Sequence, residues 1–265
     1  MSFPNIIYGD YGDEKATSST KIGSLPLGTR MVLPDGAEYV QGRASATAMV
    51  AGNLYQGNAG IQATDADYKC SIAVASGGAA GSTTVVLTAG ATTGVTVDQF
   101  QDGTLITASS VGTGVGHVYR IKSNASAAAG SSITINLYPT DPFKVALAAG
   151  STTCGLREHE YFNLTLTTGD TVGVGTLAGV APVAVAASYY CWVQRKGRAA
   201  VKGDGTLIVG VPVVPSDNAD GAVESWPTSA ADTAGVRAGL SANIIGICEN
   251  VAASVQFSLI NLKIG

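Results

Sequence analysis

The sequence predicts an all-β protein, and three observations carry this prediction. Apolar and polar residues alternate over residues 132–137, 162–167 and 255–259, which is the period-two pattern of a strand with one buried face. Glycine contributes 34 of 265 residues, and Pro-Asp-Gly and Gly-Asp-Gly triplets separate apolar stretches as turns do. Helical patterns are weak, because the best candidate, residues 229–240, contains two glycines. We therefore expect an antiparallel β-sandwich or barrel.

The alternation near residue 260 changes phase. Phe257 and Leu259 continue the apolar set of one face, whereas Ile260 and Leu262 continue it on the other. This slip predicts either a β-bulge or a strand end that is covered on both sides.

Changes in composition predict three parts along the chain. Residues 1–28 contain apolar residues and tyrosines interrupted by glycines, followed by a polar run. We expect an extended N-terminal arm there. Residues 29–69 and 156–265 are expected to form one discontinuous β-barrel or sandwich domain. Residues 70–155 are expected to be an inserted β-rich domain, because the chain from Cys70 to Tyr119 contains two ionised residues.

Charge excludes several function classes. With 15 basic and 19 acidic residues, the chain has a net charge of −4 and 13% charged residues, against about 25% in ordinary soluble domains. A hydrophobic content of 46% excludes intrinsic disorder, and the acidic balance argues against nucleic acid as a partner. Residues 171–194 are uncharged and long enough to cross a membrane, but their glycines and alternating valines predict strands, so we expect no membrane partner.

The cysteines and the N-terminal residues indicate a reducing compartment. Cys70, Cys154, Cys191 and Cys248 are too far apart to suggest a metal site, and we expect them to be small buried apolar residues. The first residues lack the features of a secretory signal, so we expect the protein in a reducing cytoplasm or in an assembly that forms there.

Residues for catalysis are sparse. His117 and His159 are far apart in the sequence, and the glycine-rich segments lack a phosphate-binding lysine, so we expect no cofactor and no metal. Glu158 and Glu160 flank His159, and strand alternation would place both carboxylates on one face, either as an acid–base pair or as a solvated edge. We favour the solvated edge and expect no enzymatic activity.

Candidate contacts with a partner come from two places. Four basic residues lie within residues 195–202, directly after two tyrosines and a tryptophan, which predicts either a hairpin tip that docks on an acidic protein surface or a solvated hairpin end. Apolar side chains of the expected arm form the second group. The candidate contact residues are Ile6, Ile7, Tyr8, Tyr11, Trp192, Arg195, Lys196 and Arg198.

Several stretches between residues 27 and 265 resemble a family of tailed-bacteriophage structural proteins that decorate, or cement, the capsid. They are Leu27-Gly28-Thr29-Arg30, Leu33-Pro34-Asp35-Gly36, Ala51-Gly52-Asn53-Leu54-Tyr55-Gln56, Tyr119-Arg120-Ile121-Lys122-Ser123-Asn124, Leu137-Tyr138-Pro139 with Asp141-Pro142, Tyr189-Tyr190-Cys191-Trp192-Val193-Gln194 with Gly197, Gly246-Ile247-Cys248 and Leu262-Lys263-Ile264-Gly265. The resemblance does not extend to the expected arm.

This resemblance implies a non-enzymatic virion protein on the outer capsid surface. Such a protein binds the major capsid protein, connects neighbouring capsid subunits and is commonly a homotrimer. The alternative that we keep is a phage head-fibre or tail receptor-binding module that recognises a host surface glycan. Few aromatic residues in the middle region argue against that alternative, because Phe100 is the single aromatic residue between residues 71 and 115.

Overall fold

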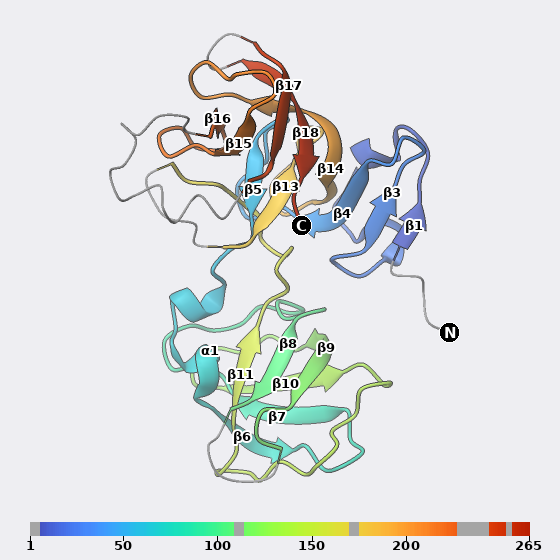
Figure 1. Cartoon of the computed structure of the whole chain (residues 1–265). Helices are drawn as coiled ribbons and strands as arrows, with labels where there is room; N and C mark the ends of the chain where they lie inside the picture. The colour runs from blue at the N-terminus through green and yellow to red at the C-terminus, as the bar shows by residue number, and fades with distance from the viewer. Residues whose placement is uncertain (1–5, 109–113, 170–174, 227–243, 253–255) are drawn as a thin grey trace. The chain divides into compact units, whose positions relative to one another are not determined.

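The computed structural model describes residues 6–108, 114–169, 175–226, 244–252 and 256–265, which fold into two compact units (Figure 1). Unit 1 contains Met1–Asn58 and Glu160–Gly265, and unit 2 contains Ala59–His159. Strand makes up 41% of the structure and helix 5%, so the all-β prediction is confirmed.

Unit 1 is built on one large sheet. Its main path runs, in spatial order, through β1 (Ile6–Tyr8), β3 (Arg30–Val32), β4 (Glu38–Arg43), β14 (Tyr190–Lys202), β18 (Phe257–Lys263), β17 (Gly246–Asn250), β15 (Pro212–Pro215) and β16 (Val223–Ser225). Four further strands pair beside this path: β2 (Thr17–Ser18), β5 (Leu54–Gln56), β12 (Thr165–Leu166) and β13 (Leu177–Val180). Both segments of the chain thus contribute to one sheet.

Strand β14 organises the sheet of unit 1. Its first half pairs with β4, from Tyr190 opposite Arg43 to Lys196 opposite Glu38, and its second half pairs with β18. The register with β4 shifts between Gln194 and Lys196, so β14 carries a bulge at this point. Apolar side chains on both sides of the sheet form separate buried clusters, which explains why the first half of β14 is nearly continuously buried.

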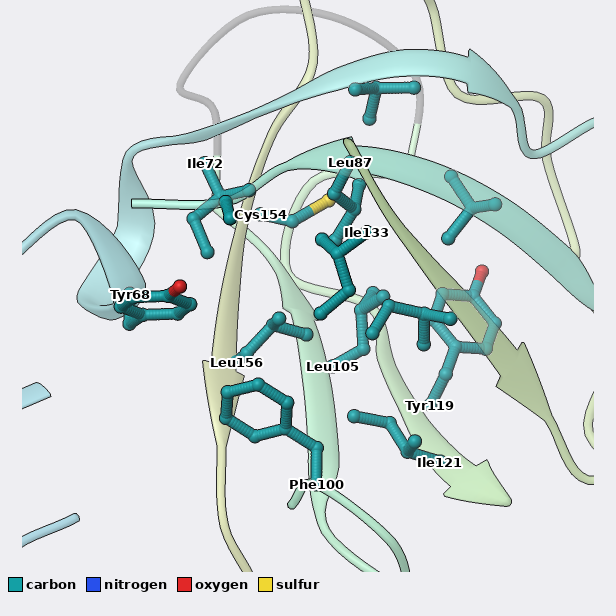
Figure 2. Packing of buried hydrophobic residues seen from close by; sticks show 14 of the residues in the cluster. Tyr68, Ile72, Leu87, Phe100, Leu105, Tyr119, Ile121, Ile133, Cys154 and Leu156 are labelled. Atoms are coloured by element: carbon teal, nitrogen blue, oxygen red, sulfur yellow. The ribbon is translucent and has the colours of Figure 1, made fainter. Parts of the chain in front are cut away.

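Unit 2 is a closed antiparallel barrel with its own core. Its strands are β6 (Ile72–Gly77), β7 (Thr84–Thr88), β8 (Thr104–Thr107), β9 (Val118–Asn124), β10 (Ser132–Leu137) and β11 (Thr153–Arg157), and they close in the order β10-β7-β6-β11-β8-β9. The predicted alternation of β10 is confirmed, because Ile133, Ile135 and Leu137 are buried. Figure 2 shows this core, in which residues from different strands point toward one another.

Unit 2 begins earlier in the chain than the insertion expected at residues 70–155. The 3-10 helix η3 (Ile61–Ala63) and helix α1 (Asp67–Cys70) precede the barrel, and Ile61 and Tyr68 lie in its core. The expected boundary lies at residue 70 because charged residues occur near α1. The buried side chains between these charged residues nevertheless belong to the barrel core.

The described part of the expected arm is not an extended arm. Strand β1 pairs in parallel with β3, and β2 pairs with β14. The 3-10 helices η1 (Asp13–Lys15) and η2 (Ile22–Ser24) complete the segment. Ile7, Ile22 and Leu25 pack against a buried cluster of unit 1, so the segment is part of the folded unit.

The structure describes residues 175–194 of the uncharged segment at 171–194. These residues contain β13 and the start of β14. Across the described ranges, no helix has the length and apolar character needed to cross a membrane. The weak helical candidate at residues 229–240 lies outside the described residues.

Candidate binding face of unit 1

The outward side of β14 and β18 carries a row of basic residues that continues into apolar residues. Lys196 lies opposite Lys263, Arg198 opposite Asn261, and Ala200 opposite Leu259 in the antiparallel register. We call this row, with Phe257 beyond Leu259, the mixed face. It consists of Lys196, Arg198, Phe257, Leu259 and Lys263.

The apolar end of the mixed face is exposed, which contradicts the predicted direction of burial. Phe257 is 51% exposed and Leu259 36% exposed, whereas Ile260 and Leu262 are fully buried on the other side of β18. The predicted bulge lies in the neighbouring strand instead, because β17 shifts register between Cys248 and Asn250. The Phe257 ring lies over Gly52, where an added Cβ atom would be 2.4 Å from the ring.

The basic end of the mixed face opens into a hollow. We call this feature the basic hollow; its charged lining residues are Arg30, Glu38, Arg195, Lys196 and Lys263. The Lys196 Nζ atom lies 2.9 Å from Glu38 Oε1, and Arg30 binds the other carboxylate oxygen. The hydrogen bond from Lys196, together with that from Arg30, outweighs desolvation and lowers the pKa of the Glu38 carboxyl.

The basic residues after Trp192 do not form a hairpin tip, because Arg195, Lys196 and Arg198 lie within β14 and Lys202 is its last residue. Arg198 Nε donates to Glu249 Oε2 at 2.7 Å, and the Lys202 Nζ atom donates to a backbone carbonyl at 3.3 Å. Arg198 and Lys196 therefore each have a carboxylate partner inside the sheet. The sequence concentrates these cations, but strand pairing partly neutralises them.

Arg195 occupies the bulge of β14, between the residues that pair with β4. Its Nη1 atom donates to the Tyr161 hydroxyl, and its guanidinium lies 5.8 Å from the centre of the Tyr161 ring. The Nε atom is buried and has no hydrogen-bond partner among the described residues. Burial raises the pKa of Tyr161 to about 12, although the charge of Arg195 opposes this shift.

Trp192 cannot be an exposed docking anchor in this structure. Its side chain is 2% exposed and packs with Met31, Leu33 and Tyr39. The strand pairs formed by β3 and β4 bring these apolar residues over Trp192. An aromatic residue next to basic residues is thus a core residue here.

The candidate residues near the N-terminus lie at the far edge of the sheet. Ile6 is opposite Arg30 in the register and is partly exposed. Tyr8 is 87% exposed and lines a separate hollow with Pro34, and Tyr11 is also exposed. The structure places β3 and β4 between this edge and β14, so the two groups of candidates do not form one site.

The acidic residues around His159 do not lie on one strand. Strand β11 ends at Arg157, and Glu158 accepts a hydrogen bond from Gln99 Nε2 at 2.6 Å. Glu158 and His159 belong to unit 2, whereas Glu160 belongs to unit 1. In the described part of the chain, no three His, Cys, Asp or Glu side chains gather as metal ligands.

Sequence reasoning missed three of the five residues of the mixed face, and Arg30 in the basic hollow. Lys263 is an isolated cation in the sequence, and Arg30 is 165 residues away from Arg195, so neither is conspicuous without the strand register. The phase change near residue 260 was the available signal for Phe257 and Leu259. Comparison with protein-family models, with curated proteins and with solved structures finds no match for this chain.

Proposed function

We propose that this chain is a structural virion protein that binds the outer surface of a phage capsid and connects neighbouring major capsid protein subunits, without catalysis. The observation that carries this proposal is the mixed face, where exposed Phe257 and Leu259 adjoin three cations on a regular sheet. The sequence resemblance to capsid decoration proteins supplies the identity of the partner.

The composition of the mixed face suits a protein interface. Aromatic residues and arginine are enriched at interfaces, and an apolar centre with a polar rim is the usual arrangement. Two strands paired over seven positions hold the side chains rigidly, which lowers the entropy lost on binding. Because a capsid offers many identical sites, even a modest contact at each one stabilises the assembled shell by mass action.

A homotrimer is part of this proposal, since the resemblance implies one. A trimer would bind three capsid positions at once and raise the effective concentration at each. The mass of the purified protein in dilute solution tests this part directly: a trimer supports it, and a monomer that persists at high concentration contradicts it.

Electron microscopy of phage particles that contain this chain tests the location. We expect density on the outer faces of the capsid, arranged with the symmetry of the shell. Density confined to the tail tip or to head fibres would contradict the proposal and support the receptor-binding alternative.

Substitution within the mixed face tests the contact. Phe257→Ala should cost about 2 kcal/mol of shell affinity, or about thirtyfold, if Phe257 is an interface anchor. Val97→Ala in unit 2 is the matched control, because Val97 is an exposed apolar residue outside this face. Equal shell occupancy for both variants and the unmodified chain would remove the mixed face from the interface.

A further inference from the structure

We propose that the basic hollow is a carboxylate-binding site that takes acidic side chains of an extended protein segment laid along β18. The site is defined by the chain itself, and the proposal depends on the proposed function only for the origin of that segment. Four cationic side chains and one carboxylate side chain line the hollow, together with Gly265 at the end of the chain: Arg30, Arg195, Lys196, Lys263 and Glu38.

The first observation is a pair of like charges in direct cross-strand register. Lys196 and Lys263 are opposite each other on β14 and β18, an arrangement that destabilises an antiparallel pair. Glu38 is shared between Lys196 and Arg30, and no carboxylate among the described residues forms an ion pair with Lys263. A bound anion would offset a repulsion that the fold leaves in place.

The second observation is how the bulge of β14 is held. The Gln194 side chain donates to the carbonyl oxygens of Lys196 at 3.1 Å and of Arg198 at 3.0 Å. Gly197 adopts a φ of 88°, which lets the backbone turn within the strand. Bulges are common beside functional sites, where they redirect a side chain. Here the bulge residue is Arg195, which lines the hollow.

The third observation is that Arg195 is fixed before any ligand arrives. Its guanidinium bonds to the Tyr161 hydroxyl, and its Nε atom is buried without a partner. A buried donor that lacks an acceptor costs stability, so the fold holds this guanidinium in place at a cost. Because an arginine guanidinium matches a carboxylate in plane and spacing, a fixed Arg195 favours this ligand.

Charge and size agree with an acidic peptide segment. Among the side chains that line the hollow, cations outnumber the single carboxylate, although the net charge of the chain is −4, so the positive potential of these side chains is local. The hollow has a volume of about 520 Å³, enough for more than one carboxylate side chain.

The geometry of β18 also predicts the order of residues in the bound segment. Lys263 and Leu259 are four residues apart on the outward side of the same strand. An extended segment along β18 has the same rise of about 3.4 Å per residue, so an acidic residue at Lys263 places a residue four positions away at Leu259. We therefore infer a ligand with an acidic residue and an apolar residue four positions apart.

Calorimetry with synthetic peptides on the full chain tests the proposal. The probe is an unstructured Ser/Thr-rich peptide with two glutamates at alternate positions, which share one face of an extended segment, and a leucine four residues from one of them. We expect saturable binding that weakens with salt, and at least tenfold weaker binding for a peptide with glutamines in place of the glutamates. Lys263→Gln should weaken binding of the first peptide about tenfold, whereas Lys122→Gln in unit 2, also an exposed lysine, should not.

Arg195→Gln is the second variant, and circular dichroism checks that this variant folds. If it does not fold, the Lys263→Gln variant still tests the proposal, because Lys263 is exposed. Equal binding of both peptides, equal binding by Lys263→Gln, or no binding at low salt would overturn the proposal. Inorganic phosphate that displaces the peptide at equal concentration would also overturn it, by making the hollow a small-anion site.

The two proposals fail in different ways. Full occupancy of capsids by Lys263→Gln would show that the acidic segment does not come from the capsid, and it would leave the capsid location intact. Glutamate-dependent peptide binding by a chain that microscopy locates at the tail tip would support the site and contradict the capsid location.

Discussion

Lys196 and Lys263 lie directly opposite each other in the antiparallel register of β14 and β18. Among the described residues, Glu38 forms an ion pair with Lys196 but not with Lys263. The sheet therefore retains a repulsion that a single substitution could remove. A fold selected for stability alone would place unlike charges at such a pair.

This relationship predicts that Lys263→Glu stabilises unit 1. The change replaces repulsion with attraction across the strand pair and should add about 0.2–1 kcal/mol to the free energy of unfolding. Denaturant unfolding at low salt measures the effect. Lys122→Glu is the control, and an equal gain in that variant would show that the effect comes from net charge and not from the pair.

Burial predicts opposite results for two aromatic residues that the sequence presents as equivalent. Trp192→Ala should destabilise unit 1 by about 3–5 kcal/mol, because it empties a packed cluster beside Met31 and Tyr39. Tyr8→Ala should change the free energy of unfolding by less than about 0.5 kcal/mol, since Tyr8 is exposed. Thermal unfolding of both variants distinguishes a core residue from a surface residue; similar losses would contradict this assignment.

Asp65 predicts a pH-dependent contribution to the stability of unit 2. Burial alone would raise the pKa of this carboxyl, but backbone N–H groups of Asp67, Thr93 and Thr92 donate to it at 2.9–3.0 Å and lower the pKa below its ordinary value of 3.8. The carboxylate therefore stabilises the fold above the unfolded pKa, and this contribution disappears as the pH falls through the lower folded pKa.

Asp65→Asn should accordingly destabilise the protein at neutral pH, because the amide accepts these bonds less well than a carboxylate does. The difference from the unmodified chain should begin to shrink below about pH 4, where the carboxyl of the unfolded chain becomes protonated, and should close as the pH falls through the lower folded pKa. Urea unfolding between pH 3 and pH 7 measures it. A difference that stays constant over this range would show that Asp65 acts through shape alone.

Thiol accessibility separates Cys70 from the other cysteines. Cys70 is exposed, contrary to the expected burial, whereas Cys154, Cys191 and Cys248 are buried. Burial raises the pKa of Cys154 and Cys191 to about 12, which suppresses the reactive thiolate. A thiol reagent should therefore modify Cys70 rapidly in the native protein and the other three only after unfolding. Rapid reaction of the native Cys70→Ser variant with the thiol reagent would contradict the burial of the other three cysteines.

The two ends of the insertion predict that unit 2 can be removed. Gly57 and Glu160 are neighbours within unit 1, since a Cβ atom at Gly57 would lie 2.4 Å from the Glu160 carbonyl oxygen. A chain in which a short glycine linker replaces residues 59–159 should keep the cooperative unfolding of unit 1, and residues 59–159 alone should fold as a closed barrel without edges. Circular dichroism and denaturant unfolding of both fragments measure this, and loss of cooperativity in either would contradict it.

The period-two patterns determined the class of the fold and many of its strands. Ile133, Ile135 and Leu137 fill the barrel core as their spacing predicts. Local patterns failed where burial depends on a neighbouring strand. Phe257 and Leu259 follow the predicted alternation, but they face outward. Ile260 and Leu262 face inward instead, because they pack in a buried cluster with residues of the neighbouring strands β14 and β17.

The sequence by itself determined an all-β chain with low charge and a basic run at residues 195–202. The tertiary structure alone decided that Trp192 is buried, that the N-terminal segment joins the sheet, and that Lys263 and Arg30 meet Arg195 at one hollow. The physical reason is strand register: periodicity along a strand is local, whereas the partner across a sheet is set by backbone hydrogen bonds between residues far apart in the chain.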